Sequence, residues 1–398
     1  LAALVPELLL IGQLIDRAGM AWCIVEFGRE EMLQVAIEEW AGSSPLYTKR
    51  MQKALKYEGV DVITIFKGLQ LDIGAPPQFM DFRYTVHDRW HGEFHLDHCG
   101  ALMDVEPMGP DYVRGMCHDI EDPTFDATAL ATNRRCQVRP IHRPPRVPAD
   151  RKPACAWTVT IDESYPEVGF IPQLDIIGAT RAYNCDLDAI DPADVGQADY
   201  SGTLMSDFDF FAFSHSALVR IAEEVCLQMH LLVLSFALAV RARCNGDVEK
   251  ERSIRTKSLI GIAGVAAERR AAALRCSSTL VRARNGSAVW GRAGRWVTST
   301  ASASSSSRGS ESFDITAASV AADEMGGLEV KTASNRRCSD LESGAEHSGS
   351  VGGSGVAWDT TRRRVGAECS ALRLRPPGPG AIETRGWSDV DRRASDIS

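Results

Sequence analysis

A change in composition near Cys244 is the feature that most limits what this chain of 398 residues can fold into. Residues 1–244 carry a net charge of −14 and hold all seven tyrosines and twelve of the thirteen phenylalanines. Residues 245–398 carry a net charge of +5, with 20 Arg, 24 Ser and only three Lys. Because aromatic side chains supply much of the area buried in a core, we expect one folded domain over residues 1–243.

The segment 245–398 is expected to be a disordered tail. It contains low-complexity runs such as Ser299–Ser307 and has little hydrophobic periodicity. It also holds Trp and Cys beside an excess of Arg over Lys, a composition that GC-rich DNA gives when it is read out of frame. We therefore hypothesise that the native reading frame is lost near Cys244. Its basic runs lack interleaved aromatic residues, so we expect no nucleic-acid partner.

The apolar segments do not predict a membrane protein. Glu7, Asp16 and Arg17 interrupt the first apolar stretch, and the run Leu231–Val240 is shorter than the roughly 20 residues of a membrane span. The chain begins at Leu1 rather than Met, so we expect a fragment. Seven cysteines, an odd number, precede Cys244, which favours reduced thiols and a cytoplasmic location.

Changes in hydrophobic period predict an α+β fold with N-terminal helices, a small antiparallel sheet with a packed helix, and a closing C-terminal helix. Alternating apolar residues around Phe82 and Phe94 predict a hairpin, and a helix is expected to begin near Pro110. The expected parts are a helical region at 1–75, a sheet and helix core at 80–165, an acidic loop at 186–209 and a helix at 214–243.

Cysteine and histidine residues cluster in the expected core and are the first candidates for catalysis. Because alternate residues of a strand share a face, His98 is expected to point inward with Phe94 and Leu96, and Cys99 to point the other way. Cys117 and His118 are neighbours on a helix and cannot serve each other. A nucleophile and its base would instead be Cys99 with His118, or Cys117 with His98.

A metal site is the alternative for the same residues. A zinc ion would take its ligands from His95, Cys99, Cys117 and His118, since such ligands can converge from different elements. The close Cys-x-x-Cys pairs that zinc and iron–sulfur sites usually include do not occur in this region. We therefore expect no cofactor, with zinc as the alternative.

The run FHLDHCGALMDVEPMGPDYVRGMCHDIEDPTFDATALATN, followed by PACAWTVTID, resembles the L-2-amino-thiazoline-4-carboxylic acid hydrolase family. In both, a strand ends in Cys, a helix carries a second Cys followed by acidic residues, and a later strand carries Cys-x-aromatic. The resemblance covers about residues 30–165, and the matching positions are Cys99, Cys117 and Cys155.

The resemblance implies hydrolytic opening of a small cyclic amidine that bears a carboxylate. Cys99 or Cys117 would attack the C=N carbon, His98 or His118 would move protons, and Glu121 or Asp122 would orient the imidazole. Arg143 or Arg146 would hold the carboxylate, next to the inward-facing Cys155. The alternatives are a non-catalytic module of the same fold that binds a small molecule or zinc, and a structural or interaction protein. A homo-oligomer is left open.

Overall fold

The computed structural model describes residues 1–274 together with the short strands β5 (Ala301–Ala303) and β6 (Phe313–Ile315), which pair antiparallel. The chain divides into two units, Leu1–Leu328 and Glu329–Ser398. The second unit lies outside the described residues, as does most of the expected disordered or out-of-frame tail.

The first 75 residues form helices, as expected. They are α1 (Leu4–Phe27), α2 (Arg29–Ala41), α3 (Ser44–Ala54) and α4 (Val62–Leu69). Gly28, with φ of 86°, makes the break between α1 and α2, a conformation that glycine adopts without strain. Asp61 caps α4 by accepting a hydrogen bond from the Thr64 N–H at 3.0 Å. The last helix of the expected helical region is therefore α4.

A four-stranded antiparallel sheet follows, which confirms the α+β class. Its strands are β1 (Met80–Val86), β2 (His91–Cys99), β3 (Cys136–His142) and β4 (Ala156–Ile161), in the spatial order β1-β2-β4-β3. The predicted hairpin is β1–β2. Pro140 lies in β3, an edge strand, where a residue without an N–H is tolerated.

Short helical segments connect β2 to β3, and longer helices complete the described unit. The first group comprises α5 (Gly100–Val105), the 3₁₀ turn η1 (Glu106–Met108), α6 (Pro110–Arg114), the π-helical turn η2 (Gly115–Ile120) and α7 (Glu121–Ala129). The second comprises α8 (Pro172–Gly178), the 3₁₀ turn η3 (Phe210–Ala212), α9 (His215–Arg243) and α10 (Val248–Ala273). The acidic segment 186–209 is irregular, as expected.

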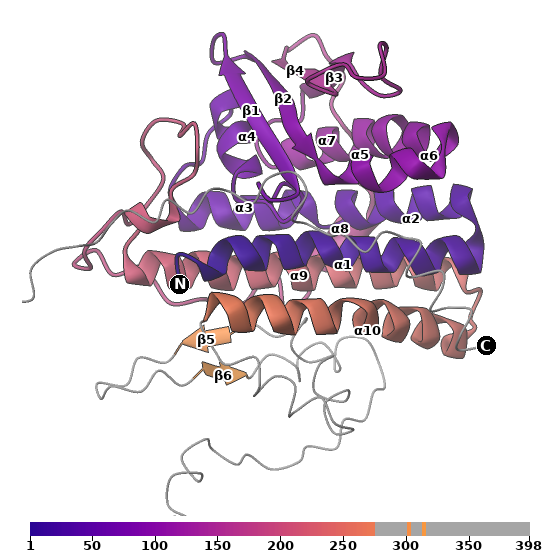
Figure 1. Cartoon of the computed structure of the whole chain (residues 1–398). Coiled ribbons are helices and arrows are strands. Elements are labelled where there is room, and N and C mark those ends of the chain that lie inside the picture. The colour runs from indigo at the N-terminus through magenta and orange to yellow at the C-terminus, as the bar shows by residue number, and fades with distance from the viewer. Residues whose placement is uncertain (275–300, 304–312, 316–398) are drawn as a thin grey trace, which may run out of the picture. The chain divides into compact units, whose positions relative to one another are not determined.

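The elements stack in layers, with α10 below α1 and α9, then α2 and α3, and the sheet above them (Figure 1). Helix α1 packs against α2, α9 and α10. A helix with neighbours on several sides is apolar around most of its circumference, and this explains the long apolar stretch at the start of the chain. One core cluster joins α1, α3 and α9, and another lies between α4, α7 and the sheet.

Helix α10 corrects the expected boundary at Cys244. Ile254, Ile262 and Ala266 of α10 are buried. The Arg269 guanidinium binds the Glu7 carboxylate of α1 at 2.5 Å, and Arg241 binds Glu251 at 3.0 Å. The Arg-rich, Phe-poor composition hid a helix whose core face uses Ile and Ala. The folded part therefore continues to at least residue 273, and α10, not the 214–243 helix, closes it.

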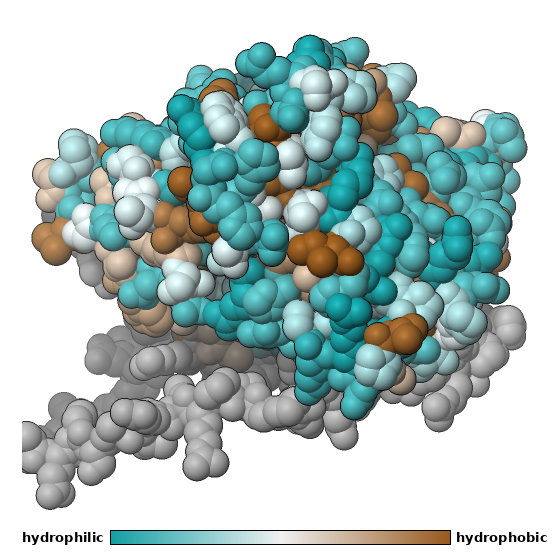
Figure 2. All heavy atoms as spheres, turned by 90° about the horizontal axis from the view of Figure 1, so that it is seen from above, coloured by the Kyte–Doolittle hydropathy of each residue, from teal (hydrophilic) through white to brown (hydrophobic). Residues whose placement is uncertain are grey.

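Two helices, α1 and α9, are long and apolar enough to cross a membrane, but 61% and 78% of their most apolar windows are buried inside the protein. The run Leu231–Val240 belongs to α9 and is a buried helix segment, as its length predicted. Figure 2 looks down on the sheet end of the molecule, where hydrophilic residues cover most of the surface and apolar residues appear in small separate groups.

Candidate functional site

Three cysteines and one glutamate meet at a small cavity beneath the sheet. Cys99 comes from the end of β2, Cys117 from the π turn, Cys155 from the residue before β4, and Glu121 from the start of α7. The cavity has a volume of about 20 Å³, which is room for a single water molecule. We call it the thiol cavity. The three cysteines that carry the family resemblance therefore do converge.

A bulge at the end of β2 turns Cys99 inward, which corrects the expected faces. Phe82 pairs with Leu96 and Met80 pairs with Cys99, so β2 holds one residue more than β1 over this interval. The extra residue shifts the alternation of side chains. Cys99, instead of His98, thus joins Leu96 at the cavity. Its Sγ accepts a hydrogen bond from the Leu102 N–H at 3.3 Å and caps α5.

The π turn positions Cys117 and Glu121. The Glu121 N–H donates to the carbonyl of Met116, five residues back, which is the hydrogen bond of a π helix. Pro123 has no N–H to donate two residues later, which weakens the regular α-helical pattern here. The result is a widened turn that places Cys117 on the buried side and directs Glu121 toward the thiol cavity.

No histidine lines the thiol cavity, so the expected cysteine–histidine pairs do not form. The His118 Nε2 bonds the Pro144 carbonyl at 2.7 Å, and the His95 Nε2 lies 3.3 Å from Asp97 on the exposed side of the sheet. Within the described part of the chain, no three His, Cys, Asp or Glu side chains are grouped so that they could hold a metal ion. At the thiol cavity, Cys99 and Cys117 meet without His95 or His118, so the four residues of the alternative zinc site are not brought together there.

The two arginines expected to bind a carboxylate are engaged elsewhere. The Arg143 Nη1 donates to the Cys117 carbonyl at 3.3 Å and to Asp122 at 2.5 Å, and its guanidinium lies over the Trp157 ring. Arg143 thus braces the π turn. Arg146 binds Glu106 at 2.5 Å on the surface. Neither guanidinium lines the thiol cavity.

The three thiols are held in the neutral form. Burial raises the pKa of Cys99 to about 12, with a further contribution from Cys155. Burial raises the pKa of Cys155 to about 11, and burial together with Glu121 raises the pKa of Cys117 well above its ordinary value. A reactive cysteine needs a lowered pKa. None of the three is activated in this arrangement.

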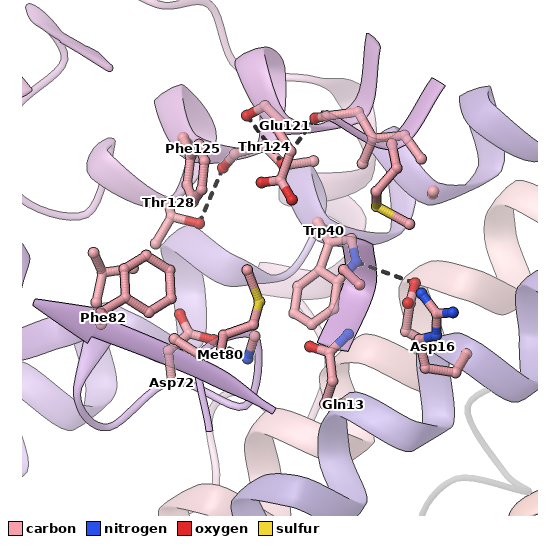
Figure 3. A pocket seen from close by; sticks show the side chains of 18 of the residues that line it. Gln13, Asp16, Trp40, Asp72, Met80, Phe82, Glu121, Thr124, Phe125 and Thr128 are labelled. Carbon is pink, nitrogen blue, oxygen red and sulfur yellow. Dashed lines mark hydrogen bonds between the residues drawn. The ribbon is translucent and has the colours of Figure 1, made fainter. Parts of the chain in front are cut away.

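A second, larger cavity adjoins the first and is lined by polar side chains that the sequence did not single out. Its volume is about 80 Å³. Helix α1 contributes Gln13, Asp16 and Arg17, and Asp72 lies between α4 and β1. Glu121, Met80 and Phe125 line both cavities. Figure 3 shows the Glu121 carboxylate extending from α7 toward Trp40 and Met80. We call this space the carboxyl chamber.

Hydrogen bonds fix the walls of the carboxyl chamber. The Trp40 Nε1–H donates to Asp16 at 3.1 Å (Figure 3). Asp72 accepts from the Tyr47 hydroxyl at 2.9 Å and from the Gly74 N–H at 2.7 Å. Arg17 pairs with Asp104 of α5. By contrast, none of the hydrogen bonds or ion pairs found among the described residues involves the Glu121 carboxylate.

Burial shifts all three carboxyl groups of the chamber toward the protonated form. It raises the pKa of Asp16 to about 6 against the opposing effects of Arg17 and Trp40, and that of Asp72 to about 6 against those of Gly74 and Tyr47. The pKa of Glu121 rises to about 8, because burial acts together with the charges of Asp122 and Asp16. Glu121 thus titrates near neutral pH, as a general acid or base requires.

The sequence contained one signal for the chamber. Asp16 and Arg17 interrupt an otherwise apolar helix, and a buried charge on such a helix is uncommon unless it is paired or functional. From the sequence, both residues were interpreted only as charges that interrupt a possible membrane span. Glu121 was named, but as a partner for an imidazole and not as the group shared by two cavities.

No family model, no curated protein and no solved structure matches this chain. The resemblance to the thiazoline carboxylate hydrolase family therefore rests on the quoted residues.

Proposed function

We propose that this protein is a hydrolase-like enzyme that acts on a small C–N bonded carboxylate, with Glu121 as the group that moves protons. The observation that carries the proposal is the place of the Glu121 carboxyl on both cavities. Its raised pKa suits proton transfer near pH 8. Convergence of Cys99, Cys117 and Cys155, the positions that carry the family resemblance, supports the same substrate class.

In the proposed reaction, the oxygen of a water molecule forms a bond to the C=N carbon of a cyclic amidine. As this bond forms, the ionised Glu121 carboxylate takes a proton from the water molecule. Protonated Glu121 then returns that proton to the ring nitrogen or ring sulfur as the ring bond to this carbon breaks. Water is the nucleophile because the neutral thiols are poor ones. Arg17, the cation in the chamber wall, replaces Arg143 and Arg146 as the group facing the carboxylate, for which it exchanges its ion pair with Asp104.

The test is turnover of 2-amino-thiazoline-4-carboxylate by the full chain, followed by mass spectrometry as loss of the cyclic substrate and gain of its ring-opened product, which carries one added water whichever ring bond breaks. We expect Glu121→Gln to lower kcat by about 10²-fold or more. Cys99→Ser should keep most of the activity, and Glu163→Gln, an exposed control, all of it. Absence of turnover in the unaltered protein, or full activity in Glu121→Gln, contradicts the proposal.

A non-catalytic binding module is the second candidate, and the raised pKa values of the three thiols favour it. In that case the same cavities hold a ligand that leaves unchanged, and turnover is absent while binding remains. None of the eight described cysteines forms a disulfide, which supports a reducing compartment such as the cytoplasm in either case.

A further inference from the structure

The carboxyl chamber differs from an ordinary buried polar cluster in the balance of its charges. Three carboxyl groups, those of Asp16, Asp72 and Glu121, face one guanidinium, Arg17, which Asp104 already neutralises. Each carboxyl that ionises inside protein requires a compensating positive charge. Among the side chains that line the chamber, Arg17 is the one that carries a positive charge.

The hydrogen bonding of the three carboxyl groups is uneven. Asp16 and Asp72 each accept hydrogen bonds from the protein. The Glu121 side chain is partly buried and extends into the chamber (Figure 3), and its carboxylate takes part in no hydrogen bond or ion pair found for the described residues. A partly buried carboxylate that accepts no hydrogen bond from the protein is open to a donor brought by a ligand.

Aromatic rings complete the wall. Trp40, Phe82 and Phe125 line the same space, and ring faces attract cations. The volume of about 80 Å³ is roughly half that of a cavity that holds benzene, so it suits a free ion of only a few heavy atoms or one cationic group of a larger substrate. The size of the chamber, its negative charge and its aromatic lining thus all favour a small cation as the ligand.

We infer that the carboxyl chamber binds a compact organic cation of the size of guanidinium or methylammonium, whose N–H groups bond Glu121 and whose charge is balanced by Asp16 and Asp72. This deepens the proposed function, since it specifies that the substrate places a cationic nitrogen group in the chamber. The binding itself needs no turnover.

The experiment measures thermal unfolding of the full chain at pH 8 with guanidinium chloride or methylammonium chloride up to ~20 mM, far below unfolding concentrations. Potassium chloride at the same ionic strength controls for salt, and urea controls for shape, because it matches guanidinium but is neutral. We expect a saturable rise in Tm with at least one organic cation, and none with potassium or urea.

Two variants locate the binding. Glu121→Gln keeps the size of the side chain and should raise the Kd at least tenfold, whereas Glu163→Gln should leave it unchanged. Ala101→Leu reduces the space of the chamber without altering charge, so it should also abolish the rise in Tm and covers the case in which Glu121→Gln folds poorly. An equal rise with potassium or urea, an unchanged Kd in Glu121→Gln, or no rise with either organic cation would overturn the inference.

The inference and the proposed function fail separately. Turnover without cation-dependent stabilisation leaves hydrolysis standing and removes the cationic group from the substrate. Cation-dependent stabilisation without turnover removes hydrolysis and leaves a binding module for organic cations.

Discussion

At the scale of single residues, Glu121 connects most of the chemistry in this protein. Its backbone makes the π-helical hydrogen bond to Met116, and its carboxyl lines both the thiol cavity and the carboxyl chamber. Its charge also contributes to the raised pKa of Cys99, Cys117 and Cys155. A substitution of Glu121 should therefore change the pH dependence of stability, the reactivity of the three thiols and the rate of any reaction that the protein catalyses.

The titration of Glu121 predicts a pH-dependent stability. Between its ordinary pKa of 4.5 and its folded pKa of about 8, the folded protein holds a proton that the unfolded chain has lost, so the free energy of unfolding falls as pH rises through this window. We expect Glu121→Gln to remove roughly 3–5 kcal/mol of that fall. Urea unfolding at pH 5 and pH 8.5 measures it.

Other groups titrate in the same pH range, but their effect on the free energy of unfolding is the same in the variant and in the unaltered protein. Glu223, whose pKa burial raises to about 7, is present in both proteins, as are Asp16 and Asp72. If the variant and the unaltered protein lost equal stability between the two pH values, Glu121 would be ionised in the folded state already at pH 5.

Gly100 allows the close approach that aims Cys99 at the cavity. A Cβ at this position would overlap the Phe79 ring. We expect Gly100→Ala to lower the free energy of unfolding by about 1–3 kcal/mol and to speed labelling of Cys99 by a thiol reagent. Gly202→Ala, where a Cβ meets nothing within 4 Å, is the control. Equal effects of the two variants would show that the Phe79 contact is unimportant.

At the scale of elements, the helices and the hairpin were predictable and the site was not. Periodicity revealed β1, β2 and the buried stripe of α9, because long amphipathic patterns reflect one core face. The inward turn of Cys99 depends on a bulge, and the position of Glu121 depends on a π turn. Both add one residue to a regular pattern, and no local signal in the sequence specifies where that residue is accommodated.

Arg143 is predicted to hold the π turn in shape. Arg143→Ala removes the hydrogen bond to the Cys117 carbonyl and the ion pair with Asp122, so the turn should open more often. We expect Cys117 to react with a thiol reagent several-fold faster. Arg146→Ala, which removes only the surface pair with Glu106, should react at the unaltered rate, and similar rates in both variants would contradict a bracing role.

At the scale of the whole molecule, α10 is an integral part of the fold, although the compositional break near Cys244 suggested otherwise. The composition predicted the wrong boundary because the counts for residues 245–398 combine α10, which has a buried face, with all the residues that follow it. The contacts of α10 with α1, including Arg269 with Glu7, link the two ends of the described unit.

Two substitutions on α10 test this arrangement. Ile262 is 3% exposed and Ile260 is 46% exposed. Ile262→Asp buries an unpaired carboxylate and should lower the free energy of unfolding by roughly 3 kcal/mol or more, whereas Ile260→Asp should change it by less than about 0.5 kcal/mol. Chemical unfolding of the full chain measures both. Equal small losses would mean that α10 does not cover α1 in solution.

The pairing of α1 with α10 also has a consequence for biosynthesis. Helix α1 is apolar on most sides, yet its partners α9 and α10 are translated some two hundred residues later. Contacts of such long sequence separation form slowly. Until α9 and α10 emerge, the part of α1 that they bury stays exposed on the nascent chain, which makes α1 a natural binding segment for chaperones.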